Sequence, residues 1–161
     1  MKVFKFGGAS VKDAAGVKNL SSIVHQQHGQ LIVVVSAMGK TTNLLETLCN
    51  AYFHQDPKAT AIMKELKDFH LNIVNSLFPL NDPVYKHLEE LFTNLENILA
   101  SESSLCYDYE YDRIICFGEL ISTTIISDYL KMEGIENQFI DIRKFLKTDQ
   151  NYRNANIDLE L

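Results

Sequence analysis

The sequence contains no tryptophan, and only three cysteines and three prolines among its 161 residues. The cysteines, at positions 49, 106 and 116, are odd in number and widely spaced, which argues against a disulfide framework and indicates buried thiols in a reducing compartment. No apolar run approaches the length of a membrane span, and residues 1–6 lack the apolar core of a signal peptide. We therefore expect a cytoplasmic protein.

Positive charge is also scarce, since 15 Lys and Arg residues face 21 Asp and Glu residues, giving a formal net charge of −6. Proteins that bind the phosphate backbone of nucleic acids normally carry a basic face. Nucleic acid is therefore not expected as the main partner, whereas small anions can still meet local positive groups. The five histidines occur in none of the spacings typical of zinc sites, so we assign no metal ligand.

What is present is the composition of one soluble globular domain, with 46% apolar and 22% charged residues and no low-complexity segment. No internal repeat or linker divides the chain. We treat residues 1–161 as a single α/β unit. Neither disulfides nor a metal ion should be needed for it to fold.

The chain opens with a strand, a glycine turn and a helix. Val3–Phe6 form a short β-prone run that ends in Gly7-Gly8. Ser10 is then expected to cap a helix that runs from about Asp13 to His25.

A second unit of the same kind follows. Residues 31–35 are all branched and apolar, which is typical of a strand buried on both faces of a parallel sheet. The glycine turn at 37–39 leads into a helix that we expect to begin at Thr41 or Thr42 and to end near His54.

The remainder of the chain is mainly helical in pattern. It predicts helices over 57–77, 82–101 and 110–133, a strand over 138–142, and a loop or short hairpin over 147–158. The expected fold class is α/β, a mostly parallel sheet with a large helical insertion between the second and third strands. Because three strands make a small sheet and the last segment is polar, we expect a fragment of a larger domain.

The first glycine turn is a candidate phosphate site. Lys5 lies at the end of the strand, and Gly7 and Gly8 carry no side chain that would keep an anion away from their backbone N–H groups. The alternative is a tight strand-to-helix connection that needs glycine only for its backbone conformation. The sequence matches neither a Walker A loop nor GxGxxG.

The second glycine turn repeats this arrangement, since SAMGKTTN, beginning at Ser36, also follows a buried strand and opens a helix. Ligands of open α/β sheets bind at the carboxyl ends of the strands, so two such turns side by side would form a phosphate cradle. The alternative is that Thr41 or Thr42 only caps the helix and that Lys40 is solvated.

Two further positions carry charge near this edge of the sheet. Glu119 interrupts an otherwise apolar segment, 114–126, where a carboxylate is costly unless it meets a cation or polar ligand. The alternative is an exposed residue on the outer face of a helix. Asp141 and Arg143 offer a charge pair that functions in binding or is simply a structural ion pair.

Four stretches, taken in order along the chain, resemble aspartate kinase in the amino acid kinase family. KFGGAS followed by Val11 is similar to the family's KFGGTSV opening, and SAMGKTTNLL is similar to its second glycine loop. FGELIS resembles its GE-bearing helix, and FIDIRKFLKTD its D-R-K segment. The resemblance implies phosphorylation of the L-aspartate β-carboxylate by ATP with Mg²⁺, the first step of lysine, threonine and methionine biosynthesis.

The resemblance implies a role for each residue of the first turn. Lys5 would contact the transferring phosphoryl group, and Gly7 and Gly8 would donate backbone hydrogen bonds to it. Ala9 stands where the family usually has Thr. The loop must therefore rely on Ser10 for a hydroxyl group.

For the second turn, the resemblance implies that Ser36 and Thr42 line the junction of phosphate and aspartate. Glu119 would hold the ammonium group of the substrate. The nucleotide-binding half of the kinase domain and the regulatory ACT domains have no counterpart in the sequence. The fragment should therefore be inactive alone, whereas the complete enzyme is expected to be a homo-oligomer.

Two alternatives stay open. One is another enzyme of the same family, acting on N-acetylglutamate, glutamate or UMP. The other is a non-catalytic domain that binds an anion or an amino acid.

Overall fold

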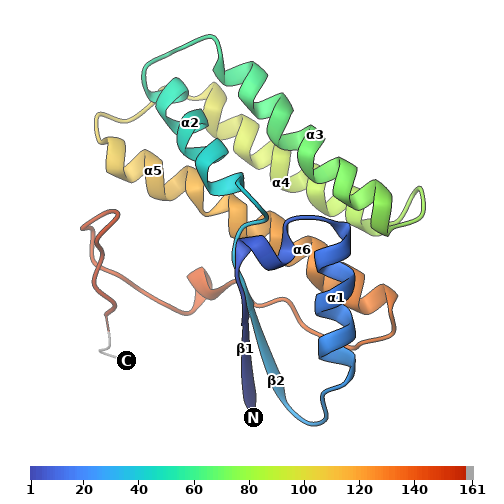
Figure 1. The fold of residues 1–161 in the computed structure, drawn as a ribbon. Coiled ribbons are helices and arrows are strands. Elements are labelled where there is room, and N and C mark those ends of the chain that lie inside the picture. Colours follow the sequence, from blue (N-terminus) through green and yellow to red (C-terminus); the bar gives the residue numbers. More distant parts are fainter. Residues whose placement is uncertain (159–161) are drawn as a thin grey trace.

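Two parallel strands, β1 (Lys2–Phe6) and β2 (Leu31–Val35), form the sheet of the computed structural model, which describes residues 1–158. Lys2 pairs with Leu31 and Phe6 with Val35, so both strands end at the same level. Helix α1 (Ala14–His25) connects them and lies beside the sheet (Figure 1). The predicted strand–turn–helix–strand opening is confirmed.

The cap of α1 differs from the prediction. Asp13, with extended backbone, is the N-cap, and its carboxylate accepts a hydrogen bond from the N–H of Gly16 at 2.8 Å. Ser10 lies instead in a 3₁₀ turn, Gly8–Val11, where its N–H donates to the carbonyl of Gly7. The chain makes this extra turn before the helix, which moves the capping position three residues downstream.

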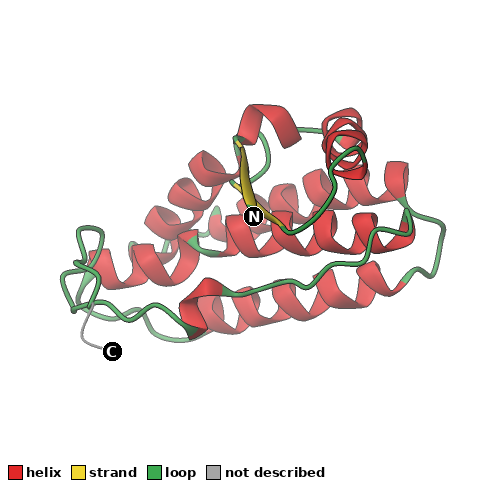
Figure 2. Ribbon diagram, turned by 90° about the horizontal axis from the view of Figure 1, so that it is seen from below, coloured by secondary structure: helices red, strands yellow, loops and turns green. Residues whose placement is uncertain are grey.

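The other helices agree with the predicted pattern except near residue 116. Four of them are α2 (Thr41–Phe53), α3 (Ala59–Leu77), α4 (Pro83–Ala100) and α5 (Tyr107–Ile115). The fifth, α6 (Phe117–Met132), follows α5 directly after Cys116, so the predicted helix over 110–133 is two helices and begins earlier. Figures 1 and 2 show that these helices make up most of the structure and that the sheet lies against them.

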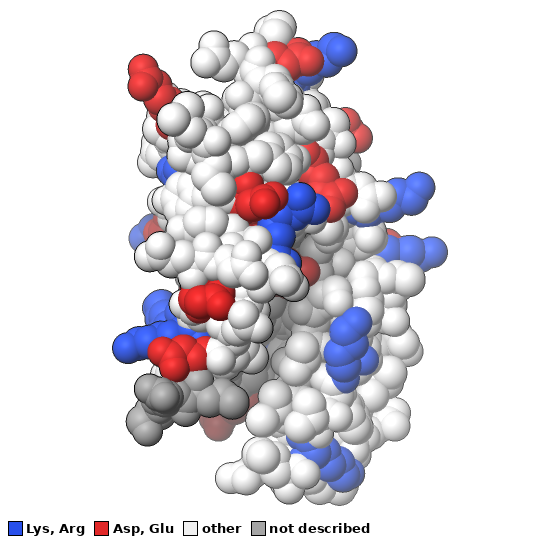
Figure 3. All heavy atoms as spheres, turned by 90° about the vertical axis from the view of Figure 1, so that its left-hand side faces the viewer, with Lys and Arg blue, Asp and Glu red and all other residues white. Residues whose placement is uncertain are grey.

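Helix α6 is central to the packing, because it contacts β2 as well as α1, α2, α4 and α5. Fully buried apolar side chains of α2 to α6 include Leu45, Leu48, Leu66, Leu88, Leu95, Ile114, Ile121 and Ile125. No helix among residues 1–158 is long and apolar enough to cross a membrane. On the face drawn in Figure 3, acidic and basic side chains are interspersed, without a basic patch.

The buried-strand prediction for residues 31–35 is wrong for one face of the sheet. Val3, Ile32 and Val34 are 61%, 45% and 46% exposed, and they point to the same side of the parallel pair. The opposite face packs against α6. Within residues 1–158 the sheet is therefore covered on one side.

The predicted third strand over 138–142 is also absent from the described residues. The chain there is irregular and ends in a 3₁₀ turn, Ile142–Lys144. An extended run becomes a strand only beside a partner, and β1 and β2 pair with each other alone in the described sheet. Residues 147–158, predicted as a loop or short hairpin, contain an antiparallel bridge between Thr148 and Ile157, which agrees with the hairpin alternative.

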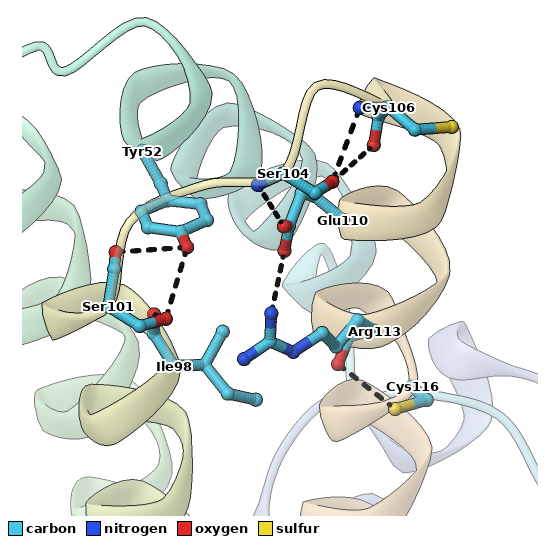
Figure 4. Close-up of polar contacts among 8 residues, drawn as sticks. All are labelled: Tyr52, Ile98, Ser101, Ser104, Cys106, Glu110, Arg113 and Cys116. Carbon is cyan, nitrogen blue, oxygen red and sulfur yellow. Dashed lines mark hydrogen bonds and ion pairs between the residues drawn. The ribbon is translucent and has the colours of Figure 1, made fainter.

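A buried carboxylate ties the start of α5 to the preceding loop. Glu110 is fully buried, and it accepts hydrogen bonds from the N–H of Ser104 at 2.7 Å and from Arg113 at 3.2 Å. Figure 4 shows both donors converging on this carboxylate. In the same view, the Tyr52 hydroxyl donates to the carbonyl of Ser101, at the end of α4.

Candidate functional site

The two glycine turns lie against each other at the carboxyl ends of β1 and β2. The register brings Phe6 and Val35 to the same level, and the N–H of Ser36 donates to the carbonyl of Phe6 at 3.1 Å. Beyond the strands, the N–H of Gly39 donates to the carbonyl of Gly8 at 3.0 Å. The expectation that the two turns are neighbours is confirmed.

Gly8 is required by this contact. A Cβ atom on Gly8 would lie 2.6 Å from the carbonyl oxygen of Ala37 and 3.2 Å from that of Gly39. Gly39 itself has φ +55°, a left-handed conformation in which glycine is favoured. The glycines therefore allow two backbones to approach each other, as well as an anion to approach them.

Lys5 places its charge over the first turn. Its side chain is exposed, and its Nζ lies 3.5 Å from the position that a Cβ of Gly7 would occupy. Lys5 forms no ion pair with any of residues 1–158. The ammonium group is thus available to an anion held above Gly7.

The hydroxyl groups at the two turns differ in how accessible they are to a ligand. Thr41 is buried, and its Oγ1 donates to the carbonyl of Met38 at 2.6 Å, so this residue anchors the second turn to α2. Thr42 and Ser36 are half-buried, and Ser10 is exposed. The local pattern did not separate Thr41 from Thr42 as the start of the helix, and the structure leaves Thr42, which the resemblance singled out, as the more accessible one.

Glu119 reaches the second turn from α6, 82 residues away in sequence. Its Oε1 accepts a hydrogen bond from the backbone N–H of Ala37 at 3.2 Å, and the residue is otherwise exposed. Gly118 allows this approach, because a Cβ there would lie 2.8 Å from the Cβ of Ala37. The structure therefore brings Glu119 together with Ser36 and the glycine turns.

Two residues beside the second turn were not singled out from the sequence. Ser122, on α6, donates from Oγ to the carbonyl of Ser36 at 3.0 Å. His70, on α3, is fully buried with Nε2 at 3.3 Å from Oγ1 of Thr41. Its Nδ1 lies 2.8 Å from the carbonyl of Leu66, an acceptor only, so Nδ1 carries the proton in the neutral ring.

Asp141 and Arg143 form a bidentate ion pair, with distances of 2.9 Å (Nε–Oδ1) and 2.7 Å (Nη2–Oδ2). These hydrogen bonds lower the pKa of Asp141. Nη1 of Arg143 also lies 3.3 Å from Sγ of Cys116, three residues before Glu119. The two side chains therefore pair with each other, close to the start of α6.

The surroundings of the second turn include a cleft of about 300 Å³ between α2 and α3, lined in part by Lys40, Asn43, Glu65 and Phe69. Among residues 1–158, no group of three or more His, Cys, Asp or Glu side chains is arranged to hold a metal ion. The polar groups at the strand ends are two lysines, backbone amides, hydroxyls and one carboxylate.

This arrangement agrees with comparisons to known proteins. A model of the amino acid kinase family matches residues 1–159. The chain belongs to the amino acid kinase family. Within this family it is similar to aspartokinase from Chlamydia pneumoniae, with 27% identity over 99% of this chain and 34% of that protein.

Further relatives within the amino acid kinase family give the same picture. Chloroplastic aspartokinase 2 of Arabidopsis thaliana is 30% identical over 96% of this chain and 29% of that protein. Escherichia coli aspartokinase III, in complex with aspartate and ADP, superposes with a TM-score of 0.86 at 25% identity, over 98% of this chain and 35% of that chain. The α/β fold class is thus confirmed, and the chain spans about a third of the length of these relatives.

Proposed function

We propose that this chain forms the aspartate-binding part of an aspartate kinase domain. In the proposed reaction, an oxygen of the L-aspartate β-carboxylate attacks the γ-phosphorus of ATP, the bond to the β,γ-bridging oxygen breaks, and 4-phospho-L-aspartate and ADP are released. The observation that carries the proposal is the contact of two glycine turns beneath Lys5, with Glu119 at the second turn.

Phosphoryl transfer depends mainly on positioning and on neutralising charge. In our proposal, Lys5 and the N–H groups of Gly7 and Gly8 stabilise the transferring phosphoryl group. Ser10 and Ser36 add hydroxyl groups at its edge. Mg²⁺ would enter as the MgATP substrate, bound to the phosphate oxygens.

Glu119 provides selectivity for an amino acid in this proposal. One carboxylate oxygen is oriented by the N–H of Ala37, which leaves the second oxygen to accept a hydrogen bond from the substrate ammonium group. Thr42 would contact the substrate from the start of α2. An N-acylated substrate such as N-acetylglutamate has no ammonium group, so Glu119 would meet no counter-charge.

The nucleotide-binding half and any regulatory domains are proposed to lie outside these residues, because the chain spans about a third of the relatives. The chain alone should therefore not turn over. In the complete protein we expect a homo-oligomer that uses ATP and aspartate.

The decisive experiment is an aspartyl-hydroxamate assay with ATP, Mg²⁺ and hydroxylamine. It compares the full-length gene product with the 161-residue chain, and aspartate with N-acetylglutamate, glutamate and UMP in matched phosphate-transfer assays. Activity on aspartate in the longer protein alone supports the proposal. Activity on one of the other acceptors reassigns the enzyme within its family. If no acceptor supports consumption of ATP, but calorimetry shows that the protein binds aspartate or phosphate, the protein is a binding domain.

A further inference from the structure

One peptide unit of the second turn is held at both of its ends by a single helix. The carbonyl of Ser36 accepts a hydrogen bond from Oγ of Ser122 at 3.0 Å. The N–H of Ala37, which belongs to the same planar peptide, donates to Oε1 of Glu119 at 3.2 Å. Rotating this peptide out of its present orientation would break both hydrogen bonds.

The spacing on α6 explains why both bonds form together. Glu119 and Ser122 are three residues apart and therefore lie on the same face of the helix. Gly118 lets this face approach Ala37 closely, as its own missing Cβ would be 2.8 Å from that of Ala37. Helix α6 thus places the acceptor Glu119 and the donor Ser122 at the distance from each other that is needed to bind the N–H and the C=O of one peptide.

Ser122 is fully buried, so its hydroxyl cannot reach a substrate at the strand ends. Its single proton has two acceptors within reach, the carbonyl of Ser36 at 3.0 Å and that of Glu119 at 3.1 Å. Within residues 1–158, the carbonyl of Ser36 has no other hydrogen-bond donor. Removing the hydroxyl therefore releases one end of the peptide and leaves the other tied to Glu119.

The orientation of this peptide extends to the first turn. The two turns are joined by the hydrogen bond from Gly39 to Gly8, and the carbonyl of Ala37 packs against Gly8. A change at peptide 36–37 would therefore displace the backbone that we propose as the phosphate cradle. Displacements of about 1 Å can lower a rate about a hundredfold.

We infer that Ser122 is a positioning residue for phosphoryl transfer, which acts by fixing the peptide between Ser36 and Ala37. The inference rests on the proposed function. It assigns Ser122 an effect on the chemical step and little effect on aspartate affinity, because Glu119 keeps its carboxylate.

The test compares Ser122→Ala with Ser127→Ala in the full-length gene product. Ser127 is a matched control, since it is a buried serine of the same helix whose hydroxyl donates to Asn137 at 2.7 Å, away from the turns. We expect kcat to fall roughly ten- to a hundredfold in Ser122→Ala, with KM for aspartate changed less than about threefold. Ser127→Ala should keep kcat within about twofold of the wild-type value.

A second readout is amide hydrogen exchange in peptide fragments that cover residues 33–40. Faster exchange there in Ser122→Ala, but not in Ser127→Ala, supports the inference. Equal kcat in the two variants, or unchanged exchange at 33–40 in Ser122→Ala, overturns it. If the wild-type protein does not phosphorylate aspartate, the proposed function fails, and the exchange data alone decide whether Ser122 fixes the turn.

Discussion

A Cβ atom on Gly8 would lie 2.6 Å from the backbone carbonyl oxygen of Ala37. The neighbouring atom is backbone and belongs to the turn that α6 holds through Ser122 and Glu119, so it has little freedom to move. The two glycine turns are thus built as one unit.

Gly8→Ala is expected to separate the turns, whereas Gly7→Ala should preserve them. A Cβ on Gly7 would meet only the flexible end of Lys5 at 3.5 Å, and Gly7 has φ −74°, which alanine adopts readily. We expect Gly8→Ala to lower the free energy of unfolding by about 1–3 kcal/mol, and Gly7→Ala to change it by less than about 1 kcal/mol. Urea denaturation measures both. Equal values for the two variants would contradict the steric argument.

Lys5→Ala should slow the chemical step in the full-length protein. Loss of one preorganised group that stabilises charge in the transition state costs about 2–4 kcal/mol, which corresponds to a fall in kcat of about 30-fold to 900-fold. KM for aspartate should change little, because Lys5 is proposed to contact phosphate. Steady-state kinetics with Lys2→Ala as control, on the same strand, tests the assignment. A rise in KM at constant kcat would move Lys5 to substrate binding.

Glu119→Gln and Glu119→Ala separate the two proposed roles of this carboxylate. Gln keeps an oxygen that can accept the N–H of Ala37 but loses the charge that pairs with ammonium. In the Glu119→Gln variant we expect KM for aspartate to rise about tenfold or more, with a smaller change in kcat. The Glu119→Ala variant should also have a lower kcat, because it loses the hydrogen bond that holds the N–H of Ala37. Identical kinetics in both variants would show that the hydrogen bond to Ala37 has no part in catalysis.

Much of the fold could be predicted from local pattern, because strand and helix residues here carry their own periodicity. Apart from the helix cap at Ser10 and the break at Cys116, two predictions fail: the burial of Ile32 and Val34, and the strand at 138–142. Both depend on which other segment lies beside the strand. A branched apolar run shows that a segment favours extended structure, but it does not show which residues cover it.

The candidate site was predicted where a residue is unusual for its surroundings. Lys5 and Gly8 stand at a strand end, and Glu119 interrupts an apolar helix, so each can be recognised from the sequence alone. Ser122 and His70 cannot be recognised in this way, because a serine or histidine in a helix is common. The hydrogen bond that each makes to a distant turn depends on tertiary packing. Two polar residues on a buried helix face would be the signal to look for.

His70 makes stability depend on pH. Burial lowers the pKa of His70 from 6.5 to about 4, so the unfolded chain binds more protons than the folded chain between these values. Stability contributed by the neutral ring is fully present above pH 6.5 and is lost as the pH falls towards 4, up to about 3 kcal/mol. Denaturation measured from pH 7 to 4 should show a flatter pH dependence in His70→Gln than in wild type. Exposed His28, replaced by Gln, should leave the slope unchanged.

Glu110 should be the carboxylate whose loss costs the most stability in the helical layer. It is fully buried and joins Ser104 to Arg113, so Glu110→Ala leaves a backbone N–H and a guanidinium without their partner. Breaking such a buried pair costs about 3 kcal/mol, whereas Glu110→Gln keeps an acceptor for Ser104 and should cost about half as much. Glu90, which pairs with Lys86 on the surface at 3.9 Å, provides the control, with a change of about 0.5 kcal/mol or less on replacement by Ala. Chemical denaturation of the three variants measures the free energy of unfolding that each substitution removes. If Glu110→Gln costs as much as Glu110→Ala, the ion pair with Arg113 contributes more to stability than the hydrogen bond to Ser104.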